Sequence, residues 1–242
     1  MILNYIKSVK IKQGELSSIN KIGIQKERSL HSAVKKLYSE PGDLIEHKIG
    51  KYVIDIVRND LLIEIQTSNF SAIKKKLSDL INNYKILVVY PIAELKTITK
   101  VSDSGEILSS RKSPKKFCLY DVFDELINIR NFLNHKNFSL EVLIINEEQI
   151  RKNDGQGSWR RRGISLIDRK LVGIKEKKVF VSSEDFKKFI PKKLKKPYSN
   201  KTFAEKTGIS IYKSRKVNYV LKSMGIINIC GKNKNELLFD FS

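Results

Sequence analysis

Apolar and polar positions alternate most clearly across residues 52–67, in the stretch YVIDIVRNDLLIEIQT. A period of two is typical of β-strands, whose successive side chains point to opposite faces. The pattern therefore predicts one strand over residues 52–57 and a second over residues 61–66. The intervening Arg-Asn-Asp consists of turn-forming residues, so we expect an antiparallel hairpin.

Two carboxylates interrupt these apolar strands, Asp55 in the first and Glu64 in the second. Alternation places Leu62, Glu64 and Gln66 on one face of the second strand. Burying a carboxylate is costly unless a partner neutralises it, and a divalent cation is a common partner. Asp55 and Glu64 are therefore a candidate magnesium site.

The spacing Asp-x8-Glu-x-Gln, formed by Asp55, Glu64 and Gln66, resembles the active-site motif of the PD-(D/E)xK nuclease superfamily, which has the restriction-endonuclease-like fold. The resemblance implies an α/β core with the element order α-β-β-β-α-β. It implies Mg²⁺ or Mn²⁺ held by Asp55, Glu64 and the Ile65 carbonyl, and an endodeoxyribonuclease that hydrolyses phosphodiester bonds. Most members carry Lys at the third position, so Gln66 follows the minority pattern, and the lead Asp lacks a preceding Pro.

The flanking segments can be read in the order that the resemblance implies. Apolar spacing predicts a helix over residues 27–39 and, after a strand near residues 43–48, a second helix that ends near Asn82. The apolar run over residues 85–92 is typical of a strand covered on both faces. By analogy with the family, Glu27 on the first helix would be a further acidic residue near the metal. Lys74 on the second helix would reach a substrate phosphate, although a solvated lysine face fits the same pattern.

The rest of the first 150 residues extends this predicted α/β domain. Residues 103–116 are rich in Ser, Gly, Pro and Lys and predict a basic loop or hairpin. A helix over residues 117–132 and a buried strand over residues 138–145 would follow. We therefore expect residues 1–150 to form a nuclease-like domain.

The net charge of +21 indicates a polyanionic partner, and the charge is distributed unevenly. Residues 1–150 hold 23 basic against 18 acidic residues, a net of +5, whereas residues 151–242 hold 24 against 8, a net of +16. No long amphipathic helix gathers the basic residues as membrane-surface binding would require. Double-stranded DNA is the favoured partner.

Residues 151–197 change composition and predict a basic arm and linker. Arg160, Arg161 and Arg162 follow the sole Trp, and guanidinium groups beside an aromatic ring suit phosphate binding and stacking. A plain solvated basic loop would explain the same run. Two short strands are expected at residues 164–167 and 171–174.

Residues 198–242 have the organisation of a winged helix-turn-helix. Thr202 is expected to cap a short helix and Ser210 a longer one, and two strand-like runs joined by a lysine-tipped turn follow. The longer helix would be the recognition helix. Its expected exposed residues are Tyr212, Lys213, Arg215, Lys216 and Asn218, and the wing would present Lys232 and Lys234.

Other classes of protein are less well supported. Cys118 and Cys230 lie far apart with no metal-ligand spacing, so neither a disulfide framework nor a zinc site is expected. No signal peptide or membrane-length apolar run is visible, which favours a cytoplasmic protein. A homodimer is also compatible with the sequence. Two alternatives remain: a non-catalytic DNA-binding regulator on a decayed nuclease fold, and an RNA-binding or RNA-processing protein.

Overall fold

A large mixed β-sheet organises the chain in the computed structural model, which describes residues 29–115 and 117–241. Its strands run in the order β1-β2-β3-β4-β6-β7, and β5 pairs with the far part of β4. The first three strands are antiparallel neighbours, β3 is parallel to β4, β4 is parallel to β6, and β6 is antiparallel to β7. The strands are β1 (Leu44–Ile49), β2 (Tyr52–Arg58), β3 (Leu61–Ile65), β4 (Lys85–Val101), β5 (Ile107–Lys112), β6 (Phe138–Asn153) and β7 (Ile164–Phe180).

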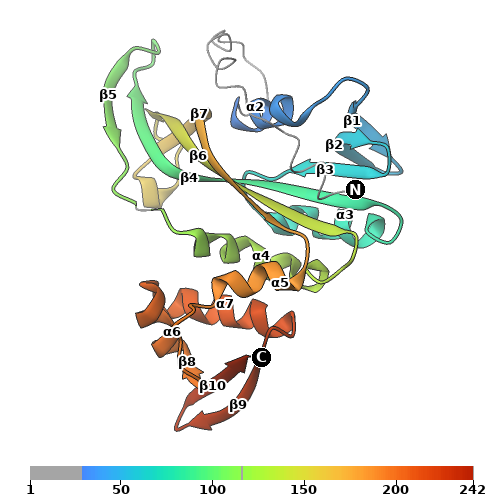
Figure 1. Cartoon of the computed structure of the whole chain (residues 1–242). Helices are drawn as coiled ribbons and strands as arrows, with labels where there is room; N and C mark the ends of the chain where they lie inside the picture. Colours follow the sequence, from blue (N-terminus) through green and yellow to red (C-terminus); the bar gives the residue numbers. More distant parts are fainter. Residues whose placement is uncertain (1–28, 116, 242) are drawn as a thin grey trace.

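Helices cover both faces of this sheet, as Figure 1 shows. Helix α2 (Ser29–Tyr38) packs on one face over a cluster that includes Ile63, Ile65 and Leu143. On the other face lie the short helices that precede β4 and those that follow β5 in the sequence. They are η2 (Phe70–Ile73), α3 (Lys74–Leu80), η3 (Leu119–Val122), α4 (Phe123–Ile129) and η4 (Arg130–Phe132). The chain is therefore a mixed α/β protein.

The C-terminal residues form a second, three-stranded sheet, three further α-helices and one short 3₁₀ helix. Helix α5 (Ser183–Phe186) follows β7 and leads through the short helix η6 (Lys187–Phe189) to the second sheet. That sheet has the order β8-β10-β9. Its strands are β8 (Tyr198–Ser199), β9 (Ile227–Asn233) and β10 (Glu236–Phe241), and helices α6 (Asn200–Thr207) and α7 (Ile211–Ser223) lie between β8 and β9 in the sequence.

The hydrophobic core under α3 and α4 continues without a break into the C-terminal part. Phe123 and Leu126 of α4 belong to the same buried cluster as Val217 and Leu221 of α7. Phe189 stacks on Phe180 at a centroid distance of 5.4 Å and bridges the two parts. The C-terminal helices are therefore fixed against α4 by apolar packing, and Figure 1 shows α7 directly below it.

Several sequence predictions are confirmed at the level of secondary structure. The hairpin β2–β3 forms with Ile56 opposite Ile63, and its turn contains Asn59 in the left-handed region (φ 52°). From α2 to β4 the observed element order is helix, three strands, helix and strand. The strand predicted over residues 85–92 is longer than expected and extends to Val101.

Other predictions were wrong in detail. The two short strands expected after the arginine run are one continuous strand, β7, because β6 pairs with it along most of its length. Ser199, not Thr202, caps α6, since its side chain accepts hydrogen bonds from the N–H groups of Lys201 and Thr202. The prediction of a basic loop or hairpin over residues 103–116 is, by contrast, confirmed, because β5 in this segment pairs antiparallel with β4. Among the described residues, no helix is long and apolar enough to cross a membrane.

Candidate active site

Asp55 sits where strands β2 and β3 separate. The ladder between them ends at the Ile56–Ile63 pair, and continuing its register would place Asp55 opposite Glu64. Beyond that pair, the Ile65 N–H donates to Asp55 Oδ2 at 2.8 Å. His31 of α2 approaches the same oxygen, with its Nε2 atom at 3.3 Å. The Asp55 carboxylate thus takes the place of a strand partner for β3 and is oriented from two sides.

Glu64 lies buried on β3 and is paired with a lysine from α3. Lys76 Nζ lies 2.7 Å from Glu64 Oε1 and also donates to the Val53 carbonyl oxygen at 2.7 Å. The Glu64 side chain is 3% exposed and that of Lys76 is 18% exposed. A single ammonium group therefore bridges the two strands at the point where they diverge.

The two carboxyl groups respond to this environment in opposite ways. Burial raises the pKa of Glu64 to about 7, and the nearby Asp55 charge adds to this rise, while Lys76 opposes it. The short Lys76 contact therefore offsets only part of the desolvation cost. Burial also disfavours the charged form of Asp55. Hydrogen bonds from His31 and the Ile65 N–H outweigh that cost and hold the pKa of Asp55 below its ordinary value.

Most of the predicted active-site residues gather here, although not all in the predicted way. Gln66 lies one residue beyond β3, half-buried, and its N–H bonds to the Val89 carbonyl of β4 at 2.9 Å. Ile65 is buried beside Asp55 and Glu64. Glu27 lies outside the described residues.

Lys76 is the site residue that the sequence prediction missed. Lys74, the predicted one, is exposed and lies away from the carboxylates, lining a groove toward α7. The sequence did contain a signal for Lys76, because it lies three residues after the apolar Ile73 and four before the apolar Leu80. Residues at these spacings share one face of a helix. Helical phase therefore turns Lys76, among the three consecutive lysines, toward the sheet.

The donor set suits a hard cation that keeps much of its water. Within the described part of the chain, no three acidic, histidine or cysteine side chains form a ready-made metal cluster. Mg²⁺, however, is commonly held by only one or two protein carboxylates together with waters and substrate phosphate oxygens. The pKa of Glu64 near 7 shows that local cations leave its ionised form incompletely compensated. Asp55 and Glu64 therefore fit such an ion.

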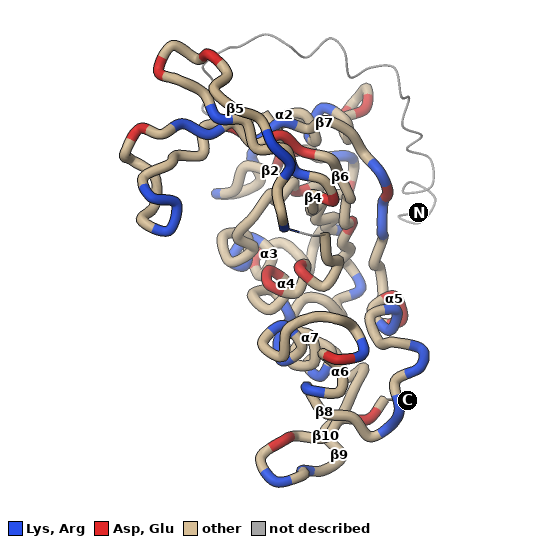
Figure 2. The backbone as a smooth tube through the Cα atoms, turned by 90° about the vertical axis from the view of Figure 1, so that its left-hand side faces the viewer, with Lys and Arg blue, Asp and Glu red and all other residues tan. Residues whose placement is uncertain are grey.

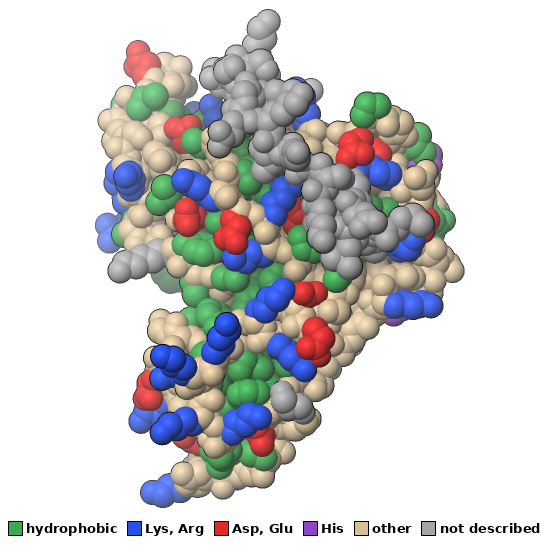
Figure 3. Space-filling model, in the orientation of Figure 1, with side chains coloured by type: hydrophobic (Ala, Val, Ile, Leu, Met, Phe, Trp, Pro, Cys, Tyr) green, Lys and Arg blue, Asp and Glu red, His purple; other side chains and the backbone are tan. Residues whose placement is uncertain are grey.

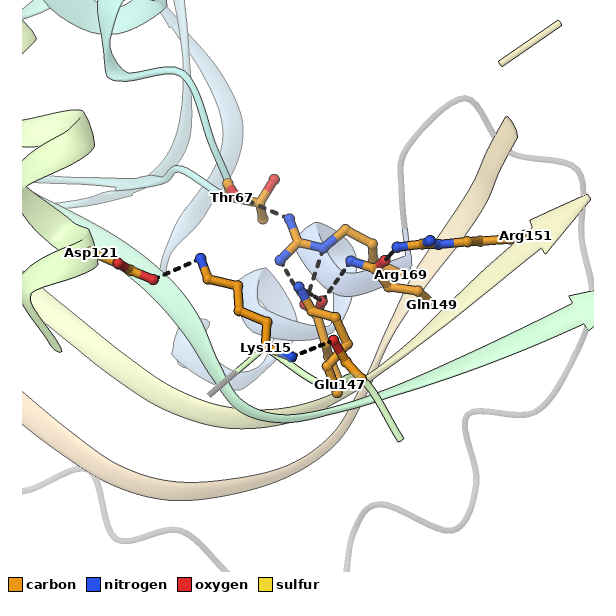
Figure 4. Close-up of polar contacts among 9 residues, drawn as sticks. Thr67, Lys115, Asp121, Glu147, Gln149, Arg151 and Arg169 are labelled. Carbon is orange, nitrogen blue, oxygen red and sulfur yellow. Dashed lines mark hydrogen bonds and ion pairs between the residues drawn. The ribbon is translucent and has the colours of Figure 1, made fainter. Parts of the chain in front are cut away.

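A second buried charge cluster supports the segment that follows Gln66. Glu147 of β6 is fully buried and is bound by Arg169 of β7 at 2.6 Å and by Lys96 of β4 at 3.1 Å. These cations outweigh the effect of burial and keep the pKa of Glu147 below its ordinary value. Arg169 also donates to the Thr67 carbonyl oxygen at 3.1 Å, as Figure 4 shows. The cluster thus ties β7 to the residue next to Gln66.

The predicted nucleic-acid-binding residues divide into exposed and engaged groups. Arg160, Arg161 and Arg162 are exposed in the connection between β6 and β7, beside Trp159 at 84% exposure. Arg215, Lys232 and Lys234 are exposed as well. Figure 3 shows Lys and Arg side chains spread across the lower part of the molecule, interleaved with hydrophobic ones.

Tyr212 of α7 is exposed as predicted, whereas the exposure predicted for Lys213, Lys216 and Asn218 was wrong. Lys213 Nζ contacts Asp121 at 2.6 Å and Asp124 at 2.5 Å, and Lys216 Nζ contacts Asp124 at 2.8 Å. Asn218 is buried and donates to Asn200 at 2.9 Å. Because α7 packs on α4, this face of the helix points into the protein and not toward solvent.

The comparisons with known proteins concern mainly the first part of the chain. Residues 28–181 match the model of a domain of unknown function, DUF8091. An uncharacterized protein of Treponema pallidum (strain Nichols) is 29% identical over 163 residues, which are 67% of this chain. The match spans 62% of that relative's length. No solved structure matches. Since the matched residues make up more than half of the chain and contain the whole Asp55–Glu64 site, the protein belongs to the DUF8091 family.

Proposed function

We propose that the protein is a metal-dependent endonuclease that hydrolyses phosphodiester bonds in DNA. The observation that carries the proposal is the pairing of Asp55 and Glu64 at the point where two strands separate, with the Lys76 ammonium 2.7 Å from Glu64. Carboxylates beside a lysine are the side chains that a metal-assisted attack on phosphate requires. The element order from α2 to β4, with β3 parallel to β4, supports a restriction-endonuclease-like core.

Each residue of the site has a role that its contacts suggest. Asp55 and Glu64 would hold Mg²⁺ or Mn²⁺, which when bound activates water and neutralises charge on the phosphate. The Ile65 N–H and His31 orient Asp55. Lys76 places a positive charge beside the site, which Gln66 as a neutral amide does not supply. The role of Gln66 would be to hydrogen-bond water or a phosphate oxygen.

The C-terminal part supports DNA binding by a winged helix. Helices α6 and α7 are joined by a short turn through Gly208 in the left-handed region (φ 71°), and the hairpin β9–β10 follows. Lys232 and Lys234 stand at the exposed tip of that hairpin, as a wing would present them. The net charge of +16 over residues 151–242 favours a polyanionic ligand.

The deciding experiment is cleavage of supercoiled and linear DNA, with RNA in parallel, in Mg²⁺, Mn²⁺ or EDTA. We expect metal-dependent DNA cleavage that disappears in Asp55→Ala and Glu64→Ala while DNA binding survives. Asp79→Ala is the matched control, because Asp79 is an α3 carboxylate that pairs with Lys51 away from the site. Binding without cleavage of any substrate would favour the non-catalytic regulator, and cleavage of RNA alone would favour RNA processing.

A further inference from the structure

A basic groove lies between the helices on the sheet and the exposed face of α7. It has a volume of about 690 Å³ and is lined from one side by η2, α3 and α4 and from the other by α7. Figure 2 shows α3, α4 and α7 following one another down the molecule. Lys74, Arg130, Arg215 and Lys216 line the groove, and no carboxylate among the described residues does.

Three of these four cations have no acidic partner in the described part of the chain. Lys216 is bound to Asp124, but no carboxylate there lies within 4.0 Å of Lys74, Arg130 or Arg215. Cations gathered without counter-charges create a positive potential that favours an anion along the groove. Three such cations lining one open groove suit a chain of phosphates.

Two tyrosines of α7 add a second kind of contact. Tyr212 and Tyr219 line the groove, are seven residues apart on one face of the helix, and are 66% and 45% exposed. Arg130 lies 5.1 Å from the ring centroid of Tyr219, and Lys216 lies 4.7 Å from that of Tyr212. Exposed rings interleaved with cations are the combination that binds unpaired bases by stacking and their backbone by charge.

The groove continues past α7 to the C-terminal hairpin. Arg215 and Tyr219 also line a second hollow of about 410 Å³, which reaches Ile229 and Leu237 of β9 and β10. Arg215 and Tyr219 therefore line both hollows. An extended ligand could therefore cross α7 from α3 to the hairpin.

We infer that this surface binds an unpaired stretch of nucleic acid, so the preferred substrate of the proposed nuclease carries a single-stranded tail or branch. The inference rests on the proposed nucleic-acid function and names its substrate class. In a duplex the faces of the bases are covered by their neighbours, so Tyr212 and Tyr219 have stacking partners only where bases are unpaired. Lys213 and Asn218, which a recognition helix would turn toward a duplex, face into the protein.

The test is equilibrium binding of the full chain, in EDTA, to three labelled DNAs, of which the two tailed ones carry equal charge in the tail. They are a blunt duplex, the same duplex with a ten-nucleotide tail, and the duplex with an abasic tail of equal length. We expect the base-containing tail to tighten binding relative to the other two. Tyr212→Ala or Tyr219→Ala should weaken the affinity for the base-containing tailed DNA by roughly 5- to 150-fold, the effect of one lost stacked base.

Variants separate stacking from charge. Tyr212→Phe and Tyr219→Phe should keep the preference, because the ring remains. Arg215→Ala should weaken binding of both tailed DNAs and lower the salt slope by roughly 0.7, the value for one phosphate of a single strand. Lys193→Ala is the control, since this exposed lysine lines neither hollow.

The outcomes for the groove and for the nuclease are distinguishable. Equal affinity for base-containing and abasic tails, or tyrosine variants that bind like the parent, would overturn the inference even if Mg²⁺-dependent cleavage is found. A tail preference that depends on the tyrosines would uphold the inference even if the parent protein cleaves no substrate in Mg²⁺ or Mn²⁺.

Discussion

Lys76 Nζ lies 2.7 Å from Glu64 Oε1 and 2.7 Å from the carbonyl oxygen of Val53, so one side chain of α3 joins β3 to β2 beside Asp55. The backbone ladder between the strands has already ended at Ile56 and Ile63, and the Asp55 carboxylate accepts the Ile65 N–H beyond it. The positive charge at the proposed site is therefore supplied from a helix and depends on the packing of α3 against the sheet.

Replacing Lys76 should reduce the proposed cleavage strongly. Lys76→Ala removes the charge nearest Glu64, and we expect the rate to fall roughly 100- to 1,000-fold, the scale of one lost electrostatic contact at a transition state. Steady-state cleavage in Mg²⁺ is the measurement, with DNA affinity recorded in parallel. Lys75→Ala, the exposed neighbour, is the control. A Lys76→Ala protein that is folded and as active as the parent would contradict the role.

Changing Gln66 tests the third position of the motif. Gln66→Ala should slow cleavage by roughly ten- to a thousandfold if the amide positions water or phosphate. Glu64→Gln removes a charged ligand and should be worse. Because Lys76 already supplies a cation, Gln66→Lys should give little gain over the parent across a metal titration. A large gain would mean that Lys76 does not serve the site.

Stability should fall with rising pH because of Glu64. Its pKa is raised from 4.5 to about 7 in the folded protein, so the folded state holds the proton more tightly than the unfolded chain. The contribution is fully present below about pH 4.5 and is lost as the pH rises through 7, at a cost of about 3 kcal/mol. Glu64→Gln, which stays neutral, should escape this loss.

The measurement is the free energy of unfolding at pH 5 and pH 8 in EDTA, for the parent and for Glu64→Gln. Glu184→Gln is the control, because Glu184 is largely exposed. Parallel curves for the parent and Glu64→Gln would show that Glu64 does not cause the pH dependence. With Mg²⁺ at pH 8, we expect the parent to gain more stability than Glu64→Gln, since a bound cation favours the ionised carboxylate.

Arg169 should be important for stability without touching the proposed site. Arg169→Ala leaves the fully buried Glu147 with Lys96 as its remaining cationic partner and frees the Thr67 carbonyl. Removing one member of a buried ion pair typically costs about 3–5 kcal/mol. Chemical unfolding of Arg169→Ala measures this cost, with the exposed Arg160→Ala expected to change stability by less than about 0.5 kcal/mol. A cost below about 1 kcal/mol for Arg169→Ala would contradict the assignment.

The C-terminal part should unfold together with the first part. Leu221 of α7 is fully buried in the cluster that contains Phe123 of α4, so Leu221→Ala should destabilise the whole chain by about 2–5 kcal/mol. We expect a single calorimetric transition in the parent and in Leu221→Ala, with Lys222→Ala, an exposed neighbour, unchanged. Two separate transitions, of which only one responds to Leu221→Ala, would contradict a shared core.

The sequence by itself determined the elements whose signals are local. The alternation over residues 52–67 was enough to predict β2 and β3, because burial on a sheet requires a period of two. The spacing of Asp55 and Glu64 predicted that they would be neighbours, since a hairpin register follows from the length of its turn. The cap at Ser210 was equally local, as it depends on residues within one turn of α7.

Only the tertiary structure decided that the sheet-facing lysine of α3 meets Glu64 and which face of α7 stays exposed. Both depend on how a helix is rotated against elements distant in the sequence: α3 against the β2–β3 hairpin, and α7 against Asp121 and Asp124. A run of basic residues carries no information about distant carboxylates, so Lys213 and Lys216 could not be told from Arg215. The basic groove was unpredictable for the same reason, because its walls come from segments more than eighty residues apart that meet only when the shared core forms.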